Sequence, residues 1–156
     1  MFNSKNTDKR ILSLDLFILL GLENLSVSEK EEYTNEFTQL VNNYFLAQKV
    51  SEFLDEDQLN EVTQKFNNGE EITKILQYLA KLIPDLDELY IEALTETKAR
   101  VVKDQYLGMK QELEEKMKDA TEEESTQIKK KLQKCENNIN YVISGEFEKI
   151  NYQIEE

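Results

Sequence analysis

Residues 85–124 read DLDELYIEALTETKARVVKDQYLGMKQELEEKMKDATEEE, a stretch whose helical pattern organises the whole chain. From Asp85 to Asp119 only Gly108 disfavours a helix, and apolar side chains recur mostly at spacings of three and four. The segment that begins at Thr121 and reaches Glu124 then matches a capping box, the signature of a new helix N-terminus. The pattern therefore predicts a long helix, a turn at about residues 120–121, and a second helix.

The second helix repeats apolar residues in a 4-3-4-3 pattern, and the phase of the repeat then slips before the end of the chain. Its apolar positions are Ile128, Leu132, Cys135, Ile139 and Val142, followed by Ile143, Phe147, Ile150 and Ile154. Two helices of about 33 residues would each be roughly 50 Å long. We predict that they form a long antiparallel, coiled-coil-like hairpin over residues 96–156, whose base packs on the rest of the protein.

Residues 12–95 predict a compact, acidic domain of about four helices. The first is short and apolar and stops at Gly21. The second begins at the capping box Ser28–Glu31 and reaches about Leu54, with an apolar stripe of Tyr33, Phe37, Leu40, Val41, Tyr44, Ala47 and Val50. The third opens with Asp55 as N-cap, buries Leu59, Val62 and Phe66, and ends before Gly69; the fourth spans about residues 72–82 and is closed by Pro84. Residues 1–11 are polar and predict a disordered tail, so the fold class is all-α.

The composition excludes most catalytic and metal chemistry. The chain has no histidine, one cysteine and four glycines, so the usual general base, metal ligand and phosphate-binding loop are missing. We expect no metal, no cofactor, no small-molecule substrate and no catalytic residues, and we predict that the protein is not an enzyme. An enzyme that uses carboxylates alone is a weaker alternative; Asp15, in the apolar first helix, would decide it by being buried or exposed.

The single cysteine and the hydropathy pattern indicate the cellular compartment. One cysteine forms no internal disulfide, and Cys135 falls on the apolar seam of the last helix, where a small buried hydrophobe is its ordinary role. The apolar run at residues 11–20 is too short for a membrane span and lacks a cleavage site. We expect a cytoplasmic protein without a membrane partner.

The formal net charge is −13, which disfavours binding to nucleic acid because phosphate contacts require Lys and Arg. Acidity on this scale serves solubility or provides a docking face for a basic partner. The exception is a run of lysines near the predicted hairpin tip, Lys129, Lys130, Lys131 and Lys134. These four residues are candidates for phosphate contact, so a ribosome-associated or nucleic-acid-associated protein is an alternative function.

Surplus apolar width on two helices indicates a binding surface for another protein. The candidate partner-binding residues are Phe45, Leu46, Phe53, Tyr90 and Ile91. Apolar surface beyond one core face is typical of a partner surface, although a helix buried on two sides would have the same pattern. We predict a non-enzymatic protein-interaction or scaffold module that binds another protein or a second copy of itself.

Three segments carry a resemblance to a known family: LLGLENLSVSEKEEY, FLDEDQLNEV and LIPDLDELY. They resemble an uncharacterised all-helical domain of candidate-phyla bacteria, a domain of unknown function. The matching features are Leu20-Gly21-Leu22, the acidic helix start at Asp55–Glu61, and the Leu-x-x-x-Ile-Pro-Asp step at Leu79–Asp85. The resemblance covers about residues 12–95, implies a helical fold, and implies no activity or site residues.

Overall fold

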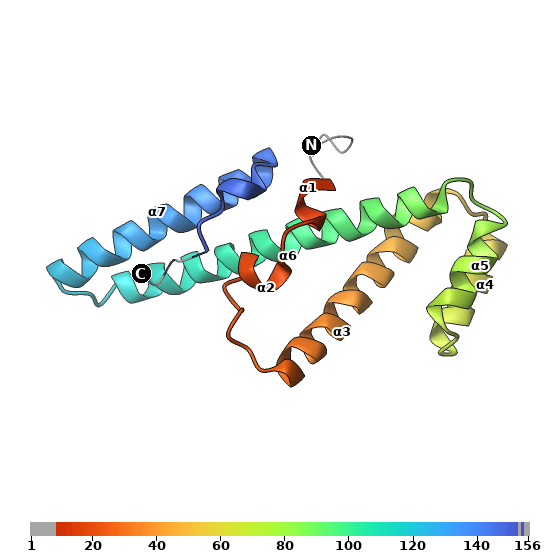
Figure 1. Ribbon diagram of the computed structural model, residues 1–156, viewed down its shortest axis with the longest axis horizontal. Helices are drawn as coiled ribbons and strands as arrows, with labels where there is room; N and C mark the ends of the chain where they lie inside the picture. Colours follow the sequence, from red (N-terminus) through yellow and green to blue (C-terminus); the bar gives the residue numbers. More distant parts are fainter. Residues whose placement is uncertain (1–8, 153, 155–156) are drawn as a thin grey trace. The chain divides into compact units, whose positions relative to one another are not determined.

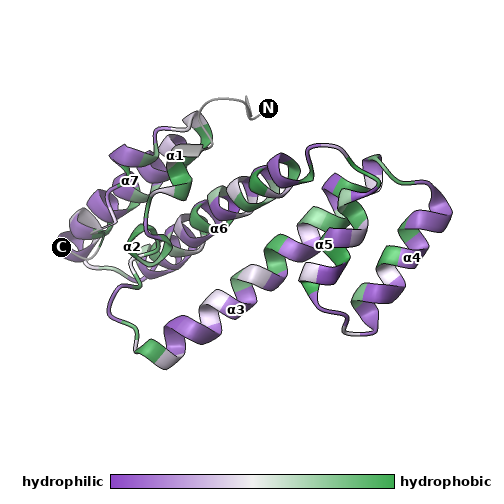
Figure 2. Cartoon of the chain, turned by 45° about the vertical axis from the view of Figure 1, so that its right-hand side comes forward, coloured by the Kyte–Doolittle hydropathy of each residue, from purple (hydrophilic) through white to green (hydrophobic). Residues whose placement is uncertain are grey.

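A computed structural model describes residues 9–152 and 154, and every regular element in these residues is helical (Figure 1). The predicted all-α class is therefore confirmed. Hydrophilic and hydrophobic residues alternate along the long helices α3 and α6, as amphipathic packing requires (Figure 2). The chain divides into two compact units, which we describe separately: unit 1 comprises the described residues of Met1–Val27 and Lys98–Glu156, and unit 2 comprises Ser28–Thr97.

Unit 2 consists of one long helical run, two shorter helices and the beginning of another long helix. The run is α3 (Val27–Tyr44), the π-helix η1 (Phe45–Lys49) and the 3-10 helix η2 (Val50–Glu52). Helices α4 (Glu56–Asn67), α5 (Ile72–Ala80) and α6 (Leu86–Met117) follow, the last of which continues into unit 1. The predicted capping box at Ser28–Glu31 is wrong, because α3 already begins at Val27 and Ser28 lies inside its first turn.

The local stop and start signals of α4 were predicted correctly. Asp55 is its N-cap: the carboxylate accepts from Gln58 N at 2.8 Å, and the Gln58 side chain accepts from Asp55 N at 3.1 Å. This reciprocal pairing satisfies two backbone donors at the helix start. The helix ends at Asn67, and Gly69 follows with a left-handed φ of +75°.

The core of unit 2 is a cluster of buried apolar residues from η1, η2, α4, α5, α6 and the segment between α5 and α6. Its members are Phe45, Val50, Val62, Ile75, Leu79, Ile83, Leu86 and Ala93. The predicted apolar stripe is right for Val41 and Val50, which are buried, and wrong for Leu40 and Ala47, which are exposed. Ala47 is exposed because of the π-turn described below.

Unit 1 combines the N-terminal segment, the rest of α6, helix α7 (Glu122–Ser144) and the C-terminal segment. A short turn joins α6 to α7, and Thr121 caps α7 through the predicted capping box with Glu124. An ion pair between Lys110 and Glu136, 3.5 Å from Nζ to Oε1, connects the two helices.

Three side chains of α6 bind backbone carbonyls of the N-terminal segment, which contains α1 (Lys9–Leu12) and α2 (Leu16–Leu19). Lys98 donates to Leu14 O, Gln105 to Leu20 O at 3.4 Å, and Tyr106 to Leu19 O at 2.7 Å. Burial lowers the pKa of Lys98, against the opposing effect of the Asp15 charge. The bonds to Leu19 and Leu20 give carbonyls at the end of α2 their partners, and the bond to Leu14 holds the link between α1 and α2.

Asp15 is exposed and is the N-cap of α2, accepting from Phe17 N at 2.9 Å and Ile18 N at 3.2 Å. The Asp15 carboxylate, which the sequence placed in a short apolar helix, is therefore a capping group at the surface. It is not the buried carboxylate that a carboxylate-only active site would need.

Helix α7 ends earlier than predicted, and this corrects the hairpin helix that was expected to run to Ile154. Gly145 adopts a left-handed φ of +77° and terminates the helix. The phase slip near Val142 is thus a helix end, after which residues 147–149 form the 3-10 helix η3 (Phe147–Lys149). The fully buried Asn138 then holds the chain: Nδ2 donates to Asn151 O at 2.7 Å, and Oδ1 accepts from Asn151 N at 2.9 Å.

The predicted domain limits and the observed units differ at the N-terminus. We predicted a tail over residues 1–11 and a domain over residues 12–95, whereas residues 9–12 form α1 with Ile11 fully buried. Residues 1–8 of the predicted tail lie outside the described residues. The segment up to Val27 belongs to unit 1 because its partners are the side chains of α6 named above.

Candidate functional site

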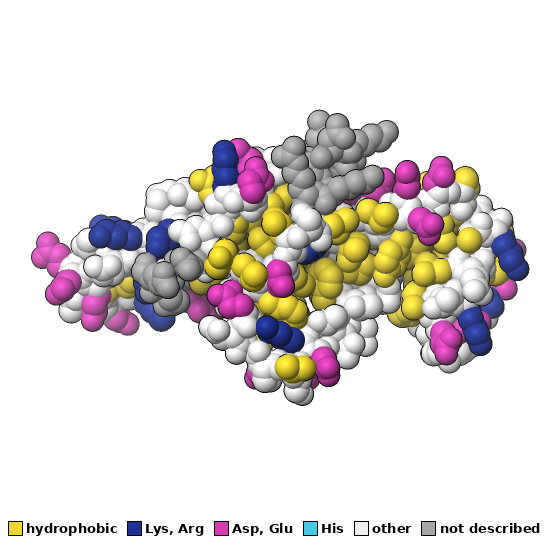
Figure 3. All heavy atoms as spheres, viewed as in Figure 1, with side chains coloured by type: hydrophobic (Ala, Val, Ile, Leu, Met, Phe, Trp, Pro, Cys, Tyr) yellow, Lys and Arg dark blue, Asp and Glu magenta, His cyan; other side chains and the backbone are white. Residues whose placement is uncertain are grey.

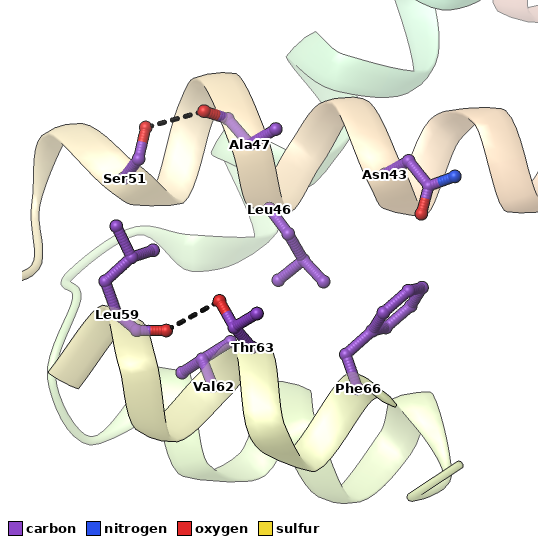
Figure 4. Close-up of a pocket in the computed structure, with 8 residues that line it drawn as sticks. All are labelled: Asn43, Leu46, Ala47, Ser51, Leu59, Val62, Thr63 and Phe66. Carbon is purple, nitrogen blue, oxygen red and sulfur yellow. Dashed lines mark hydrogen bonds between the residues drawn. The ribbon is translucent and has the colours of Figure 1, made fainter. Parts of the chain in front are cut away.

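The candidate site is a cleft of about 340 Å³ in unit 2, which we call the η1–α4 groove (Figure 4). One wall is the end of α3 with η1 and η2, and the other wall is α4. The lining residues are Asn43, Leu46, Ala47 and Ser51 on the first wall, and Leu59, Val62, Thr63 and Phe66 on the second. Leu46 points from the first wall toward α4, and Leu59 and Phe66 point from α4 toward it (Figure 4). Facing apolar side chains therefore form the inside of the groove.

The π-turn of η1 exposes this wall. The Val50 N–H donates to Phe45 O, five residues back, and both side chains are fully buried in the core. On an α-helix, residues five apart point about 140° away from each other, so both could not enter one core. The wider turn aligns them and leaves Ala47 at the surface of the groove. π-turns inside α-helices are frequent at functional sites.

The two hydroxyl groups of the groove are satisfied by their own helices. Ser51 Oγ donates to Ala47 O and Thr63 Oγ1 donates to Leu59 O, both at 2.8 Å. These hydroxyls therefore need no ligand as an acceptor, and the contact that the groove offers is chiefly apolar.

The lysines nearest to the groove in sequence are held in ion pairs. Lys49 lies 2.8 Å from Glu96 Oε1 and 3.6 Å from Glu92 Oε2. Burial alone would lower the pKa of Lys49, but the hydrogen bond and charge of Glu96 outweigh burial and raise it. Tyr44 also donates to Glu96. Lys65 lies 3.5 Å from Glu70 Oε2 and 5.3 Å from the ring centre of Tyr78.

The five predicted partner-binding residues do not form one surface. Phe45 is fully buried, and its ring packs edge-to-face on Tyr90 at 5.0 Å between centroids. Tyr90 also donates to Asn42 Oδ1 at 2.9 Å. Phe45 is therefore not accessible to a partner, whereas Tyr90 is only partly buried. Leu46 lines the groove, whereas Phe53 and Ile91 are exposed outside it, by 53% and 36% respectively.

The predicted phosphate-contacting lysines are on α7 in unit 1. Lys129 and Lys130 are exposed, whereas Lys131 and Lys134 are half-buried and already have interactions of their own. At about 100° per residue the four side chains spread over more than half of the helix circumference. Acidic and basic side chains intermingle at the end of unit 1 where α6 meets α7 (Figure 3). This arrangement is not a continuous basic face.

Sequence reasoning assigned Leu59, Val62 and Phe66 to the core and missed the groove that they line. Only Val62 is buried; Leu59 and Phe66 are partly exposed. Their spacing of three and four was the correct signal for a common face, but spacing does not show how much of that face a neighbouring helix covers.

A second cleft, of about 630 Å³, lies where α6 meets α7 and is lined mostly by charged and polar side chains: Lys116, Asp119, Glu123, Glu124, Gln127 and Ile128. Within residues 9–152 and 154, no three acidic or cysteine side chains gather in a way that could hold a metal ion, and Cys135 is buried. In the same residues, no helix has the length and apolar character needed to cross a membrane. No protein-family profile, curated protein or solved structure matches the chain, so the resemblance over residues 12–95 stays a prediction.

Proposed function

We propose that this protein is a non-enzymatic interaction module that binds a helical segment of another protein in the η1–α4 groove. The observation that carries the proposal is the groove itself: two helical walls that present apolar side chains to each other and leave about 340 Å³ between them. An amphipathic helix that lays its apolar face between two helices is a recurrent mode of protein recognition.

The surface beside the groove supports a helical occupant. Leu40, which is 52% exposed, lies three and seven residues before Asn43 and Ala47 and so extends the same face of α3. On α4, the lining residues from Leu59 to Phe66 span about two turns, roughly 10 Å. A groove of this length matches apolar residues on two successive turns of a bound helix.

The finer architecture is part of the proposal. Unit 2 would present the groove, and α6 and α7 would form the long antiparallel hairpin predicted for residues 96–156. The short turn before Thr121 and the Lys110–Glu136 ion pair support the hairpin. A cytoplasmic location belongs to the same proposal, since a single buried cysteine is compatible with a reducing compartment.

The test uses the full chain and a fluorescent, amphipathic peptide of leucine and glutamine, about 18 residues long so that a helix can form. Fluorescence anisotropy measures its binding to the wild type and to Ala47→Lys, which puts a long charged side chain into the groove. Gln48→Lys is the matched control, because it adds the same charge at the next exposed position, outside the groove lining.

We expect saturable binding that Ala47→Lys weakens at least about tenfold and that Gln48→Lys leaves within about twofold, because burying an unpaired ammonium is costly. Circular dichroism and thermal melting confirm that both variants fold. Equal effects of the two substitutions, or no binding to the folded wild type, would refute the groove as the binding site. Light scattering over a tenfold concentration range adds the oligomeric state: a dimer that Ala47→Lys dissociates would make a second copy the occupant.

A further inference from the structure

The two units differ sharply in charge. Unit 2, residues 28–97, contains 16 acidic and five basic side chains, a net charge of −11, whereas the residues of unit 1, 1–27 and 98–156, contain 16 acidic and 14 basic side chains, a net charge of −2. Nearly all of the excess negative charge of the protein therefore belongs to the unit that contains the η1–α4 groove.

Four of the 16 acidic side chains of unit 2 lie at one end of this groove. Ser51 and Leu59 lie at the same end (Figure 4), where the segment of residues 52–57 joins the two walls. That segment contains four exposed carboxylates, Glu52, Asp55, Glu56 and Asp57. There is no basic residue between Val50 and Gln64, and the flanking Lys49 and Lys65 are ion-paired to other carboxylates.

Helix stability accounts for only part of this pattern. Asp55 caps α4, and Glu56 and Asp57 lie in its first turn, where the helix dipole favours acid. Glu52 is different, because it ends the preceding helical run, where the dipole disfavours a carboxylate. The helix dipole therefore does not explain Glu52, whose exposed, solvated carboxylate can meet a basic side chain of a partner.

We propose that the occupant of the η1–α4 groove is a cationic amphipathic helix of another protein, whose lysine or arginine residues meet the carboxylates of residues 52–57. The inference rests on the proposed function and adds the chemistry of the partner. Apolar side chains one turn apart contact Leu46, Leu59 and Phe66, and the basic end of the helix lies against Glu52 and Glu56. Such charge pairing sets the direction of the bound helix and speeds its association.

The experiment compares two derivatives of the leucine–glutamine peptide, one with three lysines at its C-terminal end and one with three glutamates there. Both are titrated against the full chain in about 50 mM and about 500 mM salt, between which the Debye length falls severalfold. The test variant is Glu52→Gln with Glu56→Gln. The matched control is Glu31→Gln with Glu32→Gln, which removes the same charge from α3 at least 11 residues, about 16 Å, before Asn43.

We expect the lysine peptide to bind the wild type at least about tenfold more tightly than the glutamate peptide in low salt, and the ratio to approach one in high salt. The Glu52/Glu56 variant lowers the low-salt ratio to below about threefold, and the Glu31/Glu32 variant keeps most of it. Retention of the full ratio in the Glu52/Glu56 variant would place the recognised charge elsewhere and overturn the proposal.

The remaining outcomes separate this inference from the proposed function. Equal affinities of the two charged peptides, with normal binding of the leucine–glutamine peptide, would overturn the cationic partner and leave the groove function standing. Failure of all three peptides to bind the folded protein would overturn both. A wild-type dimer that Ala47→Lys dissociates would assign the groove to a second copy of the protein. That outcome would likewise overturn the cationic partner.

Discussion

At the scale of single residues, Tyr106 illustrates how one polar atom is accommodated in the apolar interior of unit 1. Its side chain is 1% exposed, and its hydroxyl donates to Leu19 O at 2.7 Å. Tyr106→Phe removes the donor and leaves a buried carbonyl without it. We expect a loss of about 1–2 kcal/mol in the free energy of unfolding at neutral pH, measured by urea denaturation.

The same substitution has a pH signature. Burial raises the pKa of Tyr106 above the ordinary value of 10.0, so above pH 10 the unfolded chain loses this proton and the folded chain keeps it. The stability contributed by the neutral hydroxyl is complete below pH 10 and is lost as the pH rises toward the folded-state pKa. The wild type therefore loses stability faster than Tyr106→Phe above pH 10, and the gap between them narrows. Tyr152→Phe, at an exposed position, is the control, and its free energy of unfolding should change with pH as that of the wild type does. A difference in stability between the wild type and Tyr106→Phe that stayed constant above pH 10 would contradict the role given to the buried hydroxyl.

At the scale of elements, two glycines predict opposite effects of the same change. Gly69 has a left-handed φ of +75° and nothing within 4 Å of an added Cβ, so Gly69→Ala introduces backbone strain alone. Gly108 is inside α6, also with nothing within 4 Å. We expect Gly69→Ala to lower the melting temperature, at a cost of about 1–2 kcal/mol, and Gly108→Ala to raise it, by about 0.5–1 kcal/mol. Shifts of the same sign would contradict these helix limits.

Elements whose signals are local were predictable from the sequence, and those that depend on distant contacts were not. Asp55 and Thr121 were identified correctly because a capping box involves residues only three apart, although the same pattern at Ser28–Glu31 lies inside α3 and marks no helix start. The π-turn was missed because it forms where Phe45 and Val50 both enter a core made by other helices. The groove was missed for the same reason: the exposure of Leu59 and Phe66 is set by how closely the other wall of the groove approaches them.

The end of α7 was missed for a different reason. Gly145 is a recognisable helix stop, but the apolar repeat continues beyond it and so predicts a longer helix.

At the scale of the whole molecule, charge opposes folding. The chain carries a net charge of −13, and −11 of it belongs to residues 28–97, so like charges repel when unit 2 compacts. Raising the NaCl concentration from about 20 to about 200 mM shortens the Debye length from above 20 Å to below 10 Å. We expect the urea midpoint of unfolding to rise over this range. A smaller rise in the Glu31→Gln, Glu32→Gln variant would identify repulsion as the cause, and a fall in the midpoint would show that the ion pairs dominate instead.

Unit 1 is assembled from both ends of the sequence, with all of unit 2 between them. During synthesis the carbonyls of Leu14, Leu19 and Leu20 emerge first, and their donors on Lys98, Gln105 and Tyr106 follow more than 80 residues later. At 5–20 residues per second this interval is on the order of 10 seconds. Throughout it, the nascent N-terminal segment has to be kept from aggregation without the helix that will later bind it, while the contiguous residues of unit 2 can already fold.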